Sequence, residues 1–281
     1  MDERHAGDVR RVRWVWGPPG DPLALVELFE DHNHTGWFRL RLALHPAHDT
    51  PTRREDLWHH VEEALALPDV GTVTASVRED WWELDFLKAR GFAEYDRMWR
   101  SALDLEGFDP APFAPSLERA RAAGIEVVTL SHFPWRKEAI GRRLYALMVE
   151  LLGDVPWSAP TLPWPFELWR ERVLPARDFD PDGFYLAVRG EDWIGVTELR
   201  PEPGRPDTLH QGLTGVRRAW RGQGVAWALK VRAALDARTR GYRHARATNH
   251  QVNRAMLDIN ARMGYVREPA WIELKRERPR P

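Results

Sequence analysis

The sequence has 281 residues, 43% of them hydrophobic, and its 41 Lys and Arg nearly balance its 42 Asp and Glu. This length exceeds that of a typical domain, about 100 to 200 residues, so it predicts two domains. The balanced charge gives no electrostatic footprint for nucleic acid or for a membrane surface. Because cysteine is absent, the chain has no disulfide, no thiolate metal site and no cysteine nucleophile.

The N-terminal segment from Met1 to Arg11 is charged and lacks the apolar core of a signal peptide. No run in the sequence reaches the roughly 18 apolar residues that a membrane-spanning helix requires. We therefore expect a cytoplasmic protein with neither nucleic acid nor membrane as a partner, and a homodimer stays open. Histidine pairs in the first half lack metal-binding spacing, so we expect no metal site. These pairs are His32 and His34, His45 and His48, and His59 and His60.

The first half of the chain has the pattern of strands followed by an alternation of helix and strand. No segment before the third strand leaves room for a helix. A proline-rich stretch at 107–115 predicts a linker, so we expect domains at 1–106 and 116–281. The three opening strands are expected at Val12–Trp16, Leu23–Leu28 and Phe38–Leu44.

The second half opens with a predicted strand, Ile125–Leu130, and a helix that Ser131 caps and that extends to Leu152. Pro165 is expected in the first turn of a shorter helix that ends at Val173. A hairpin, a strand, a long helix, a strand, a helix and two strands follow. These elements are expected at Phe184–Val188, Trp193–Leu199, Leu209–Val216, Val225–Arg240, His244–Thr248, Val252–Met263, Tyr265–Glu268 and Trp271–Lys275.

The loop at 221–226 has the sequence RGQGVA and joins a predicted strand to a predicted helix. Gly222 and Gly224 allow the backbone to take positive φ and to approach a ligand closely. The helix that follows offers unpaired N–H groups and the positive end of its dipole. This combination favours a phosphate. A Rossmann loop is disfavoured because no third small residue follows, and a P-loop because no Lys-Ser/Thr follows.

With Thr214-Gly215-Val216 before the loop and Asn253 after it, this segment resembles motif A of the GNAT N-acetyltransferase superfamily. The resemblance implies an α/β fold with a mixed sheet and acetyl-coenzyme A as co-substrate. It implies transfer of the acetyl group to a primary amine by direct attack in a ternary complex. The pyrophosphate would accept hydrogen bonds from backbone N–H groups at 223–226.

The same resemblance places the pantetheine arm in a splay between two strands, where it pairs with the backbone of Val216. Backbone polarisation of the thioester carbonyl there would act as an oxyanion site. Asn249 and Asn253 have a turn or a helix cap as their alternative role. The full set assigned to the coenzyme is Thr214, Gly215, Val216, Arg221, Gly222, Gln223, Gly224, Val225, Ala226, Asn249, Asn253 and Asn260.

The segment at 47–52 aligns with the loop at 219–224, which suggests a tandem duplication. The first copy has Asp49, Thr50, Pro51 and Thr52 where the second has its glycines. A carboxylate there would repel a pyrophosphate. We therefore expect two GNAT-like domains, the first degenerate, and one coenzyme site per chain.

Catalytic residues are less clearly marked. The family often has a tyrosine in the last helix as general acid, and the matching position is Asn260, whose amide cannot give up a proton at neutral pH. His210 and Glu198 are the two candidates for general base, with a structural role as the alternative for each. An acyl-coenzyme A-binding sensor without turnover stays open, and so does a structural protein that binds no coenzyme.

Aromatic residues gather in the loop and helix that, by the family resemblance, would cover the acceptor groove. They suit an apolar or cationic small-molecule amine, and core packing is the alternative. A small molecule is expected as acceptor rather than a protein. The residues are Trp157, Trp164, Phe166 and Trp169.

Overall fold

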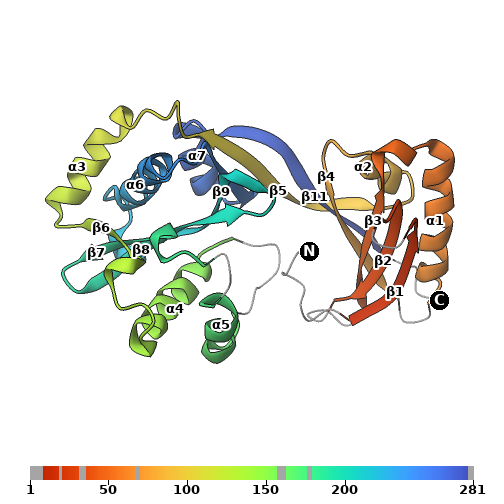
Figure 1. Cartoon of the computed structure of the whole chain (residues 1–281), viewed down its shortest axis with the longest axis horizontal. Helices are drawn as coiled ribbons and strands as arrows, with labels where there is room; N and C mark the ends of the chain where they lie inside the picture. Colours follow the sequence, from red (N-terminus) through yellow and green to blue (C-terminus); the bar gives the residue numbers. More distant parts are fainter. Residues whose placement is uncertain are drawn as a thin grey trace. The chain divides into compact units, whose positions relative to one another are not determined.

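The computed structural model describes residues 9–18, 21–31, 36–67, 70–156, 163–175 and 179–277. They fall into two compact units, one formed by the chain up to Met98 and from Pro269 onward, the other by Trp99–Glu268 (Figure 1). The boundary between the units thus falls between Met98 and Trp99, and not in the predicted linker at 107–115. The chain passes between the units within two long strands, β5 (Ala93–Asp104) and β11 (Val266–Glu277), and sequence periodicity does not show which unit a strand joins.

The first unit opens with an antiparallel meander, which confirms the three predicted strands. The third strand pairs in parallel with β4 through a helical crossover, and β4 pairs antiparallel with β11. The sheet order is therefore β1-β2-β3-β4-β11. The elements are β1 (Val9–Trp16), β2 (Ala24–Glu30), β3 (Trp37–Leu44), α1 (Pro51–Leu65), β4 (Thr72–Arg78) and α2 (Trp82–Lys88).

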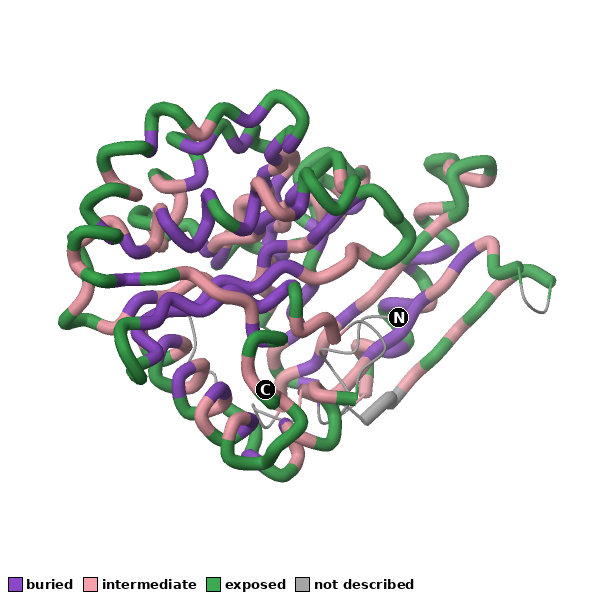
Figure 2. The backbone as a smooth tube through the Cα atoms, turned by 60° about the vertical axis from the view of Figure 1, so that its left-hand side comes forward, coloured by how far each residue is buried: buried purple, intermediate pink, exposed green. Residues whose placement is uncertain are grey.

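The core of this unit follows the period-two pattern of its strands. Val26 and Leu28 on β2 are fully buried and share one face of the strand, and Leu40 on β3 is buried between more exposed neighbours. Leu57 and Val61 on α1 are buried at helical spacing. Figure 2 shows the backbone coloured by burial, with buried stretches along strands of both units.

The second unit has a mixed sheet in the order β5-β10-β9-β8-β7-β6. The pairs from β6 to β9 are antiparallel, and β9 and β10 are parallel. The predicted hairpin and strands are confirmed; the first strand is shorter than predicted and the others are longer. The strands are β6 (Glu126–Thr129), β7 (Phe184–Arg189), β8 (Asp192–Glu202), β9 (Arg205–Val216) and β10 (His244–His250).

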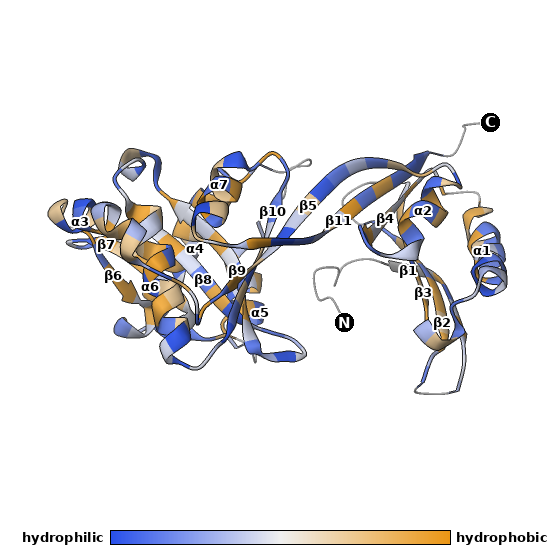
Figure 3. Cartoon of the chain, turned by 90° about the horizontal axis from the view of Figure 1, so that it is seen from above, coloured by the Kyte–Doolittle hydropathy of each residue, from blue (hydrophilic) through white to orange (hydrophobic). Residues whose placement is uncertain are grey.

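Helices cover both faces of this sheet (Figure 1). One core cluster joins α3 (Ala114–Ala122) and α6 (Val225–Thr239) to the strands, and another joins α4 (Glu138–Leu152) and α5 (Phe166–Val173) to the opposite face. The last helix is α7 (Arg254–Arg262). Figure 3 shows apolar segments on α4, α6 and β8, as this layered core requires.

The two units repeat one order of elements. In the first, β3 is followed by α1, β4 and α2, and in the second, β9 is followed by α6, β10 and α7. Each last helix ends near a glycine in the left-handed region, Gly91 with φ 83° and Gly264 with φ 89°, followed by an aromatic residue. The predicted repeat of strand, turn, helix, strand and helix is confirmed at the level of topology.

Three local predictions were wrong. Ser131 does not cap α4, which begins at Glu138, because Phe133 precedes Pro134 and is held extended. The prolines at 107–115 are followed by α3, since Pro115 lies in its first turn, where proline is tolerated. The two predicted final strands are one strand, β11.

Candidate functional site

The loop between β9 and α6 has the predicted backbone geometry. Gly222 has φ 77° and Gly224 has φ 85°, both in the left-handed region that favours glycine. A Cβ at Gly222 would meet no atom within 4 Å, so the positive φ is the reason that a glycine is required at this position. A Cβ at Gly224 would lie 2.3 Å from the carbonyl oxygen of Ser116. Gly224 therefore also permits α3 to pack against the start of α6.

The start of α6 presents donors without protein partners. Ala228 N–H donates to the carbonyl of Gly224. Within the described ranges, no acceptor lies within hydrogen-bonding distance of the backbone N–H groups of residues 223–227. These unpaired donors and the dipole of a 15-residue helix make this end of α6 suited to an anion.

Arg221 lies at the rim of the loop. Its Nε donates to the carbonyl of Val216 at 3.0 Å, and its guanidinium also pairs with Asp154. Arg218 pairs with the same carboxylate at 2.6 Å, and these hydrogen bonds hold the pKa of Asp154 below its usual value. Asp154 is therefore ionised at neutral pH and offsets part of the positive charge beside the loop.

A groove of about 590 Å³ lies beside these charges. Its walls come from the end of α4 and from the segment between β9 and the loop. Its lining residues are Glu150, Gly153, Asp154, Arg217, Arg218, Ala219 and Trp220.

The strands β9 and β10 separate beside this loop. Their parallel ladder runs from Thr208 opposite His244 to Gln211 opposite Ala247 and then stops. Both strands continue beyond it, β9 to Val216 and β10 to His250. This splay leaves one edge of β9 without a partner strand among the described residues, and an extended ligand could pair with it as an added strand.

A polar cluster surrounds Gln211, which belongs to the last residue pair of the β9–β10 ladder. Lys230 of α6 and the Tyr265 hydroxyl, the latter at 2.8 Å, both donate to Oε1 of Gln211. Gln211 Nε2 donates to the hydroxyls of Thr197 at 2.8 Å and Thr214 at 3.4 Å. These two hydroxyls are 2.6 Å apart. Sequence reasoning missed Lys230 and Gln211, although Lys230 interrupts an otherwise apolar run in α6.

The remaining coenzyme candidates have visible structural roles. Gly215 lies where a Cβ would come within 2.9 Å of the Leu151 Cβ, so it also permits α4 to pack closely. Asn253 caps α7, because its side chain accepts from the backbone N–H of Met256 at 3.3 Å. This contact agrees with the helix-cap alternative and leaves its coenzyme role a prediction.

Asn260 and Asn249 form a pair at the end of β10. Asn260 Nδ2 donates to Asn249 Oδ1 at 2.7 Å. Asn260 is only 2% exposed, and its Oδ1 has no partner among the described residues. A buried acceptor without a donor is costly, and a bound ligand can supply one. Tyr265, expected in the core, is buried.

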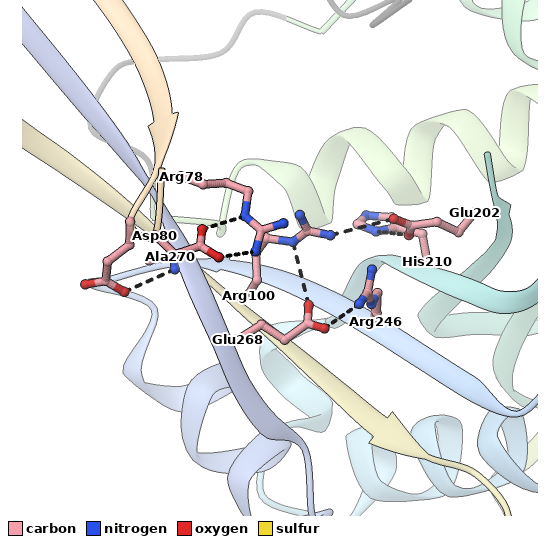
Figure 4. Close-up of polar contacts among 9 residues, drawn as sticks. Arg78, Asp80, Arg100, Glu202, His210, Arg246, Glu268 and Ala270 are labelled. Carbon is pink, nitrogen blue, oxygen red and sulfur yellow. Dashed lines mark hydrogen bonds and ion pairs between the residues drawn. The ribbon is translucent and has the colours of Figure 1, made fainter. Parts of the chain in front are cut away.

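His210 lies in a cluster of charged side chains that come from β5, β8, β9, β10 and β11 (Figure 4). Its Nδ1 is 3.6 Å from Oε2 of Glu202, and this imidazole holds the pKa of Glu202 below its usual value. Arg100 lies 3.7 Å from Glu202 and 3.9 Å from Glu268, and Arg246 pairs with Glu268. The His210 side chain is 34% exposed, so its other nitrogen can reach a ligand.

Glu198 is less accessible than His210. Its side chain is buried, and its Oε1 lies 2.9 Å from Nε of Arg200. A Cβ at Gly212 would meet Oε2 of Glu198 at 2.5 Å, so the carboxylate lies directly over this glycine. The β8–β9 ladder is irregular here, between Thr197 and Leu199. Glu198 is therefore better placed to hold this irregularity than to exchange protons with a ligand.

The aromatic groove wall is only partly visible. Phe166 and Trp169 pack in the core with α4, which agrees with the core-packing alternative. Trp164 is 44% exposed, and Trp157 lies outside the described residues.

The first unit has a different turn at the matching position. Asp49 receives two hydrogen bonds from Arg54, one of 2.8 Å from Nη2 to Oδ2, and this pairing lowers the pKa of Asp49. The Thr50 hydroxyl accepts from the N–H of Arg53 and caps α1, which begins with Pro51. This helix start is thus capped by the chain itself.

The histidine pairs have ordinary contacts where they are described. His45 Nδ1 accepts from Ala47 N–H, and His60 stacks on Trp14 at 4.1 Å between ring centroids. His32 and His34 lie outside the described residues. Among the described residues, no three potential ligands gather to hold a metal, and no helix is long and apolar enough to cross a membrane.

Known structures share this fold. A GCN5-related N-acetyltransferase from Sphaerobacter thermophilus is 22% identical, with a TM-score of 0.64 over 93% of this chain and 78% of that one. A tandem GNAT protein from the clavulanic acid biosynthesis pathway is also 22% identical, with a TM-score of 0.64 over 96% and 83%. A GCN5-related N-acetyltransferase from Kribbella flavida is 18% identical, with a TM-score of 0.55 over 97% and 90%. A comparison with curated proteins finds no match.

The fold is therefore the mixed α/β fold of GNAT proteins, which confirms the predicted fold class. Residues 149–265 match the family model of the Acetyltransferase (GNAT) family, and the chain carries a GNAT acetyltransferase domain there. The predicted resemblance is confirmed. The family and the fold support acyl transfer as the general class of reaction, and the family typically uses acetyl-coenzyme A.

Proposed function

We propose that the second unit is an N-acetyltransferase that moves an acetyl group from acetyl-coenzyme A to the primary amine of a small molecule. The observation that carries the proposal is the splay between β9 and β10 beside the open start of α6. An extended arm can pair with the free edge of β9 while its pyrophosphate accepts from the N–H groups at 223–226. One ligand with both features is an acyl-coenzyme A.

The residues of the loop divide this binding between them. Gly222 and Gly224 allow the backbone approach, Gln223, Val225 and Ala226 donate N–H groups, and Arg221 adds charge at the rim. Along the splay, the β9 segment at 214–216 lines the pantetheine arm. Asn249, Asn253 and Asn260 contact the arm from the side of β10 and α7. No metal takes part in the proposed reaction.

His210 is the proposed general base, and Glu202 orients it. The ionised Glu202 carboxylate faces Nδ1 of His210, which leaves Nε2 to accept a proton from the acceptor amine. The neutral amine nitrogen then attacks the thioester carbonyl carbon, and the C–S bond breaks as the C–N bond forms. Glu198, the second candidate, is left with a structural role.

Asn260 acts on the sulfur side without giving up a proton. Its unpartnered Oδ1 can accept a hydrogen bond from the coenzyme thiol, while its Nδ2 already donates to Asn249, and the amide cannot give up a proton at neutral pH. The departing thiolate therefore takes its proton from solvent or from the ammonium of the acceptor. The lack of a general acid at Asn260 also favours the alternative function, an acyl-coenzyme A-binding sensor without turnover.

The first unit is proposed to be a degenerate GNAT-like copy that binds no coenzyme. Its Asp49 carboxylate occupies the turn where a pyrophosphate would lie, and Arg54 is already paired with it. The protein is proposed to act in the cytoplasm, alone or as a homodimer, without nucleic acid or membrane as partner.

Release of coenzyme A from acetyl-coenzyme A in the presence of an amine library tests the proposal. The expected result is amine-dependent release that falls at least about 100-fold in His210→Gln, since a positioned base contributes about 10²- to 10⁴-fold. Glu198→Gln is the matched control and should retain most turnover. Binding of acetyl-coenzyme A without any release would favour the sensor, and no binding at all would leave a structural protein.

A further inference from the structure

Lys230 is buried in a way that charged residues rarely are. It is 2% exposed on the inner face of α6, and it donates to Gln211 while lying 5.0 Å from the centre of the Tyr265 ring. No carboxylate lies within ion-pair distance of it in the part of the chain that the structure describes. A buried ammonium without a counterion destabilises the fold, so its presence calls for a role.

The protonated lysine fixes the orientation of the Gln211 amide. In its ammonium form Lys230 has donors and no acceptor, so the atom that faces it must be the amide oxygen. The Tyr265 hydroxyl also meets this oxygen, but it could donate or accept and would fit either orientation. Lys230 is thus the residue that directs Nε2 of Gln211 toward Thr197 and Thr214.

The orientation of Gln211 in turn determines which hydroxyl donates and which accepts in the pair formed by Thr197 and Thr214. Thr197 is fully buried and accepts from Gln211, and Oγ1 of Thr214 is its one acceptor within the described ranges. The Thr197 hydroxyl must therefore donate to Thr214. Thr214 accepts from both Thr197 and Gln211, so its own proton is left to donate elsewhere. Thr214 is partly exposed and lies on β9 beyond the end of the β9–β10 ladder.

We propose that Lys230 is a positioning residue for acyl transfer, which through Gln211 and Thr197 holds the Thr214 hydroxyl as a donor to a carbonyl oxygen of acyl-coenzyme A in the splay. The inference rests on the proposed function, because that function puts the acyl-coenzyme A arm along β9. It adds a donor side chain to the backbone groups that line this edge.

The stability of the fold gives a readout that is separate from activity. Burial lowers the pKa of Lys230 to about 7, while burial raises the pKa of the facing Tyr265 hydroxyl, which stays protonated. The folded protein thus holds the proton of Lys230 less tightly than the unfolded chain does. The resulting destabilisation is complete below pH 7 and fades as pH rises toward the unfolded value of about 10.4.

Lys230→Met removes the charge and keeps the shape, so it should raise the denaturation midpoint at pH 6 and raise it less at pH 9.5. The same variant should lower kcat/KM for acetyl-coenzyme A about ten-fold, the effect of one lost hydrogen bond. Arg232→Met is the matched control, since it removes an exposed cation two residues further along α6. It should change neither the activity nor the pH dependence of stability in this way.

Gln211→Glu tests the direction of the chain. A carboxylate would still accept from Lys230 and should stabilise the fold through an ion pair, but it has no N–H to donate. Thr197 would then donate to the carboxylate and Thr214 to Thr197, so the Thr214 proton would be turned away from the ligand. A more stable and about ten-fold less active protein is expected. Thr214→Val should show the same loss, and Thr214→Ser should restore activity.

The effects of Lys230→Met and Thr214→Val should not add in the double variant, because both break one chain. Full activity of Lys230→Met, with a wild type that turns over, would overturn the inference and leave the proposed function standing. Additive losses, or a Lys230→Met protein less stable than wild type at pH 6, would likewise overturn it. A wild type that neither binds nor turns over acetyl-coenzyme A would overturn both.

Discussion

The two corners between strand and helix, at 45–51 in the first unit and 217–225 in the second, have the same topology and opposite chemistry. In the first, Thr50 caps the helix and Asp49 pairs with Arg54. In the second, two glycines in the left-handed region lead into a helix whose first N–H groups have no acceptor among the described residues. One corner is closed by its own side chains, and the other is open to an anion.

The comparison teaches that topology alone does not decide whether a helix start in this fold is left open to an anion. Both units present a strand, a turn and a helix, and in both the flanking strands are parallel. What differs is whether the helix start is capped by the chain or left for a ligand. The predictions below alter one corner or the other, and begin with the largest expected effect.

Gly222→Val should weaken binding of acetyl-coenzyme A at least about 30-fold. A β-branched residue does not tolerate φ 77°, so the loop must adopt another backbone conformation. The N–H groups then no longer point toward the same phosphate. Isothermal titration calorimetry measures the change. Gly224 is less suitable for this test, because its Cβ would also collide with Ser116 and disturb α3.

Gly241→Val is the matched control for that experiment. Gly241 follows the other end of α6, with φ 87° and no atom within 4 Å of the place where a Cβ would lie. The substitution should cost similar stability and leave coenzyme binding unchanged. Equal loss of binding in both variants would mean that general destabilisation, and not the loop, explains the result.

Arg221→Met should weaken binding of acetyl-coenzyme A about five-fold to ten-fold, with less effect at high salt, because Arg221 contributes one partly exposed charge. Arg218→Met is its control, since Arg218 pairs with the same Asp154 but is 80% exposed. Equal effects of the two substitutions would assign the loss to general charge.

Asp154→Asn should tighten binding about two-fold to three-fold near pH 7, where the lowered pKa of Asp154 keeps its carboxylate ionised. Removing this charge frees the guanidinium of Arg221 for a phosphate. The gain should shrink as pH falls through the pKa of Asp154, since the wild-type carboxyl then becomes neutral as well. Affinities measured at about pH 7 check the gain, and an affinity no tighter than that of the wild type would contradict it.

Asp49→Asn should have the smallest effect. The pair with Arg54 is partly exposed, so its loss should lower the free energy of unfolding by about 1 kcal/mol or less. Its contribution is present above the unfolded pKa of Asp and disappears as pH falls through the lower folded value. Thermal melts at about pH 7 and about pH 3 measure it. Binding of acetyl-coenzyme A to the first unit of this variant would contradict the distinction between the two corners.

Much of the fold could be predicted from local patterns. The glycines at 222 and 224, the apolar alternation of the strands and the matching glycine-aromatic pairs at the ends of α2 and α7 all act over a few residues. The assignment of β5 and β11 could not be predicted, because it depends on pairing between strands far apart in sequence. The helix α3 was missed because prolines near a helix start resemble those of a linker.

The site could be predicted only where single residue types signal it. The loop was singled out through its glycines, and His210 was proposed as a base through its place on β9. Glu202 was missed because its role depends on how β8 aligns with β9 across an irregular ladder. Gln211 was missed because its partners come from β8, α6 and the residue just before β11, which meet only in the folded protein.

Calorimetric titration of the wild-type chain with acetyl-coenzyme A tests the central claim most directly, namely that the open corner binds the coenzyme and the closed corner does not. The account predicts one site per chain, lost in Gly222→Val and kept in Asp49→Asn. Two sites in the wild type, or one site that survives Gly222→Val, would contradict it.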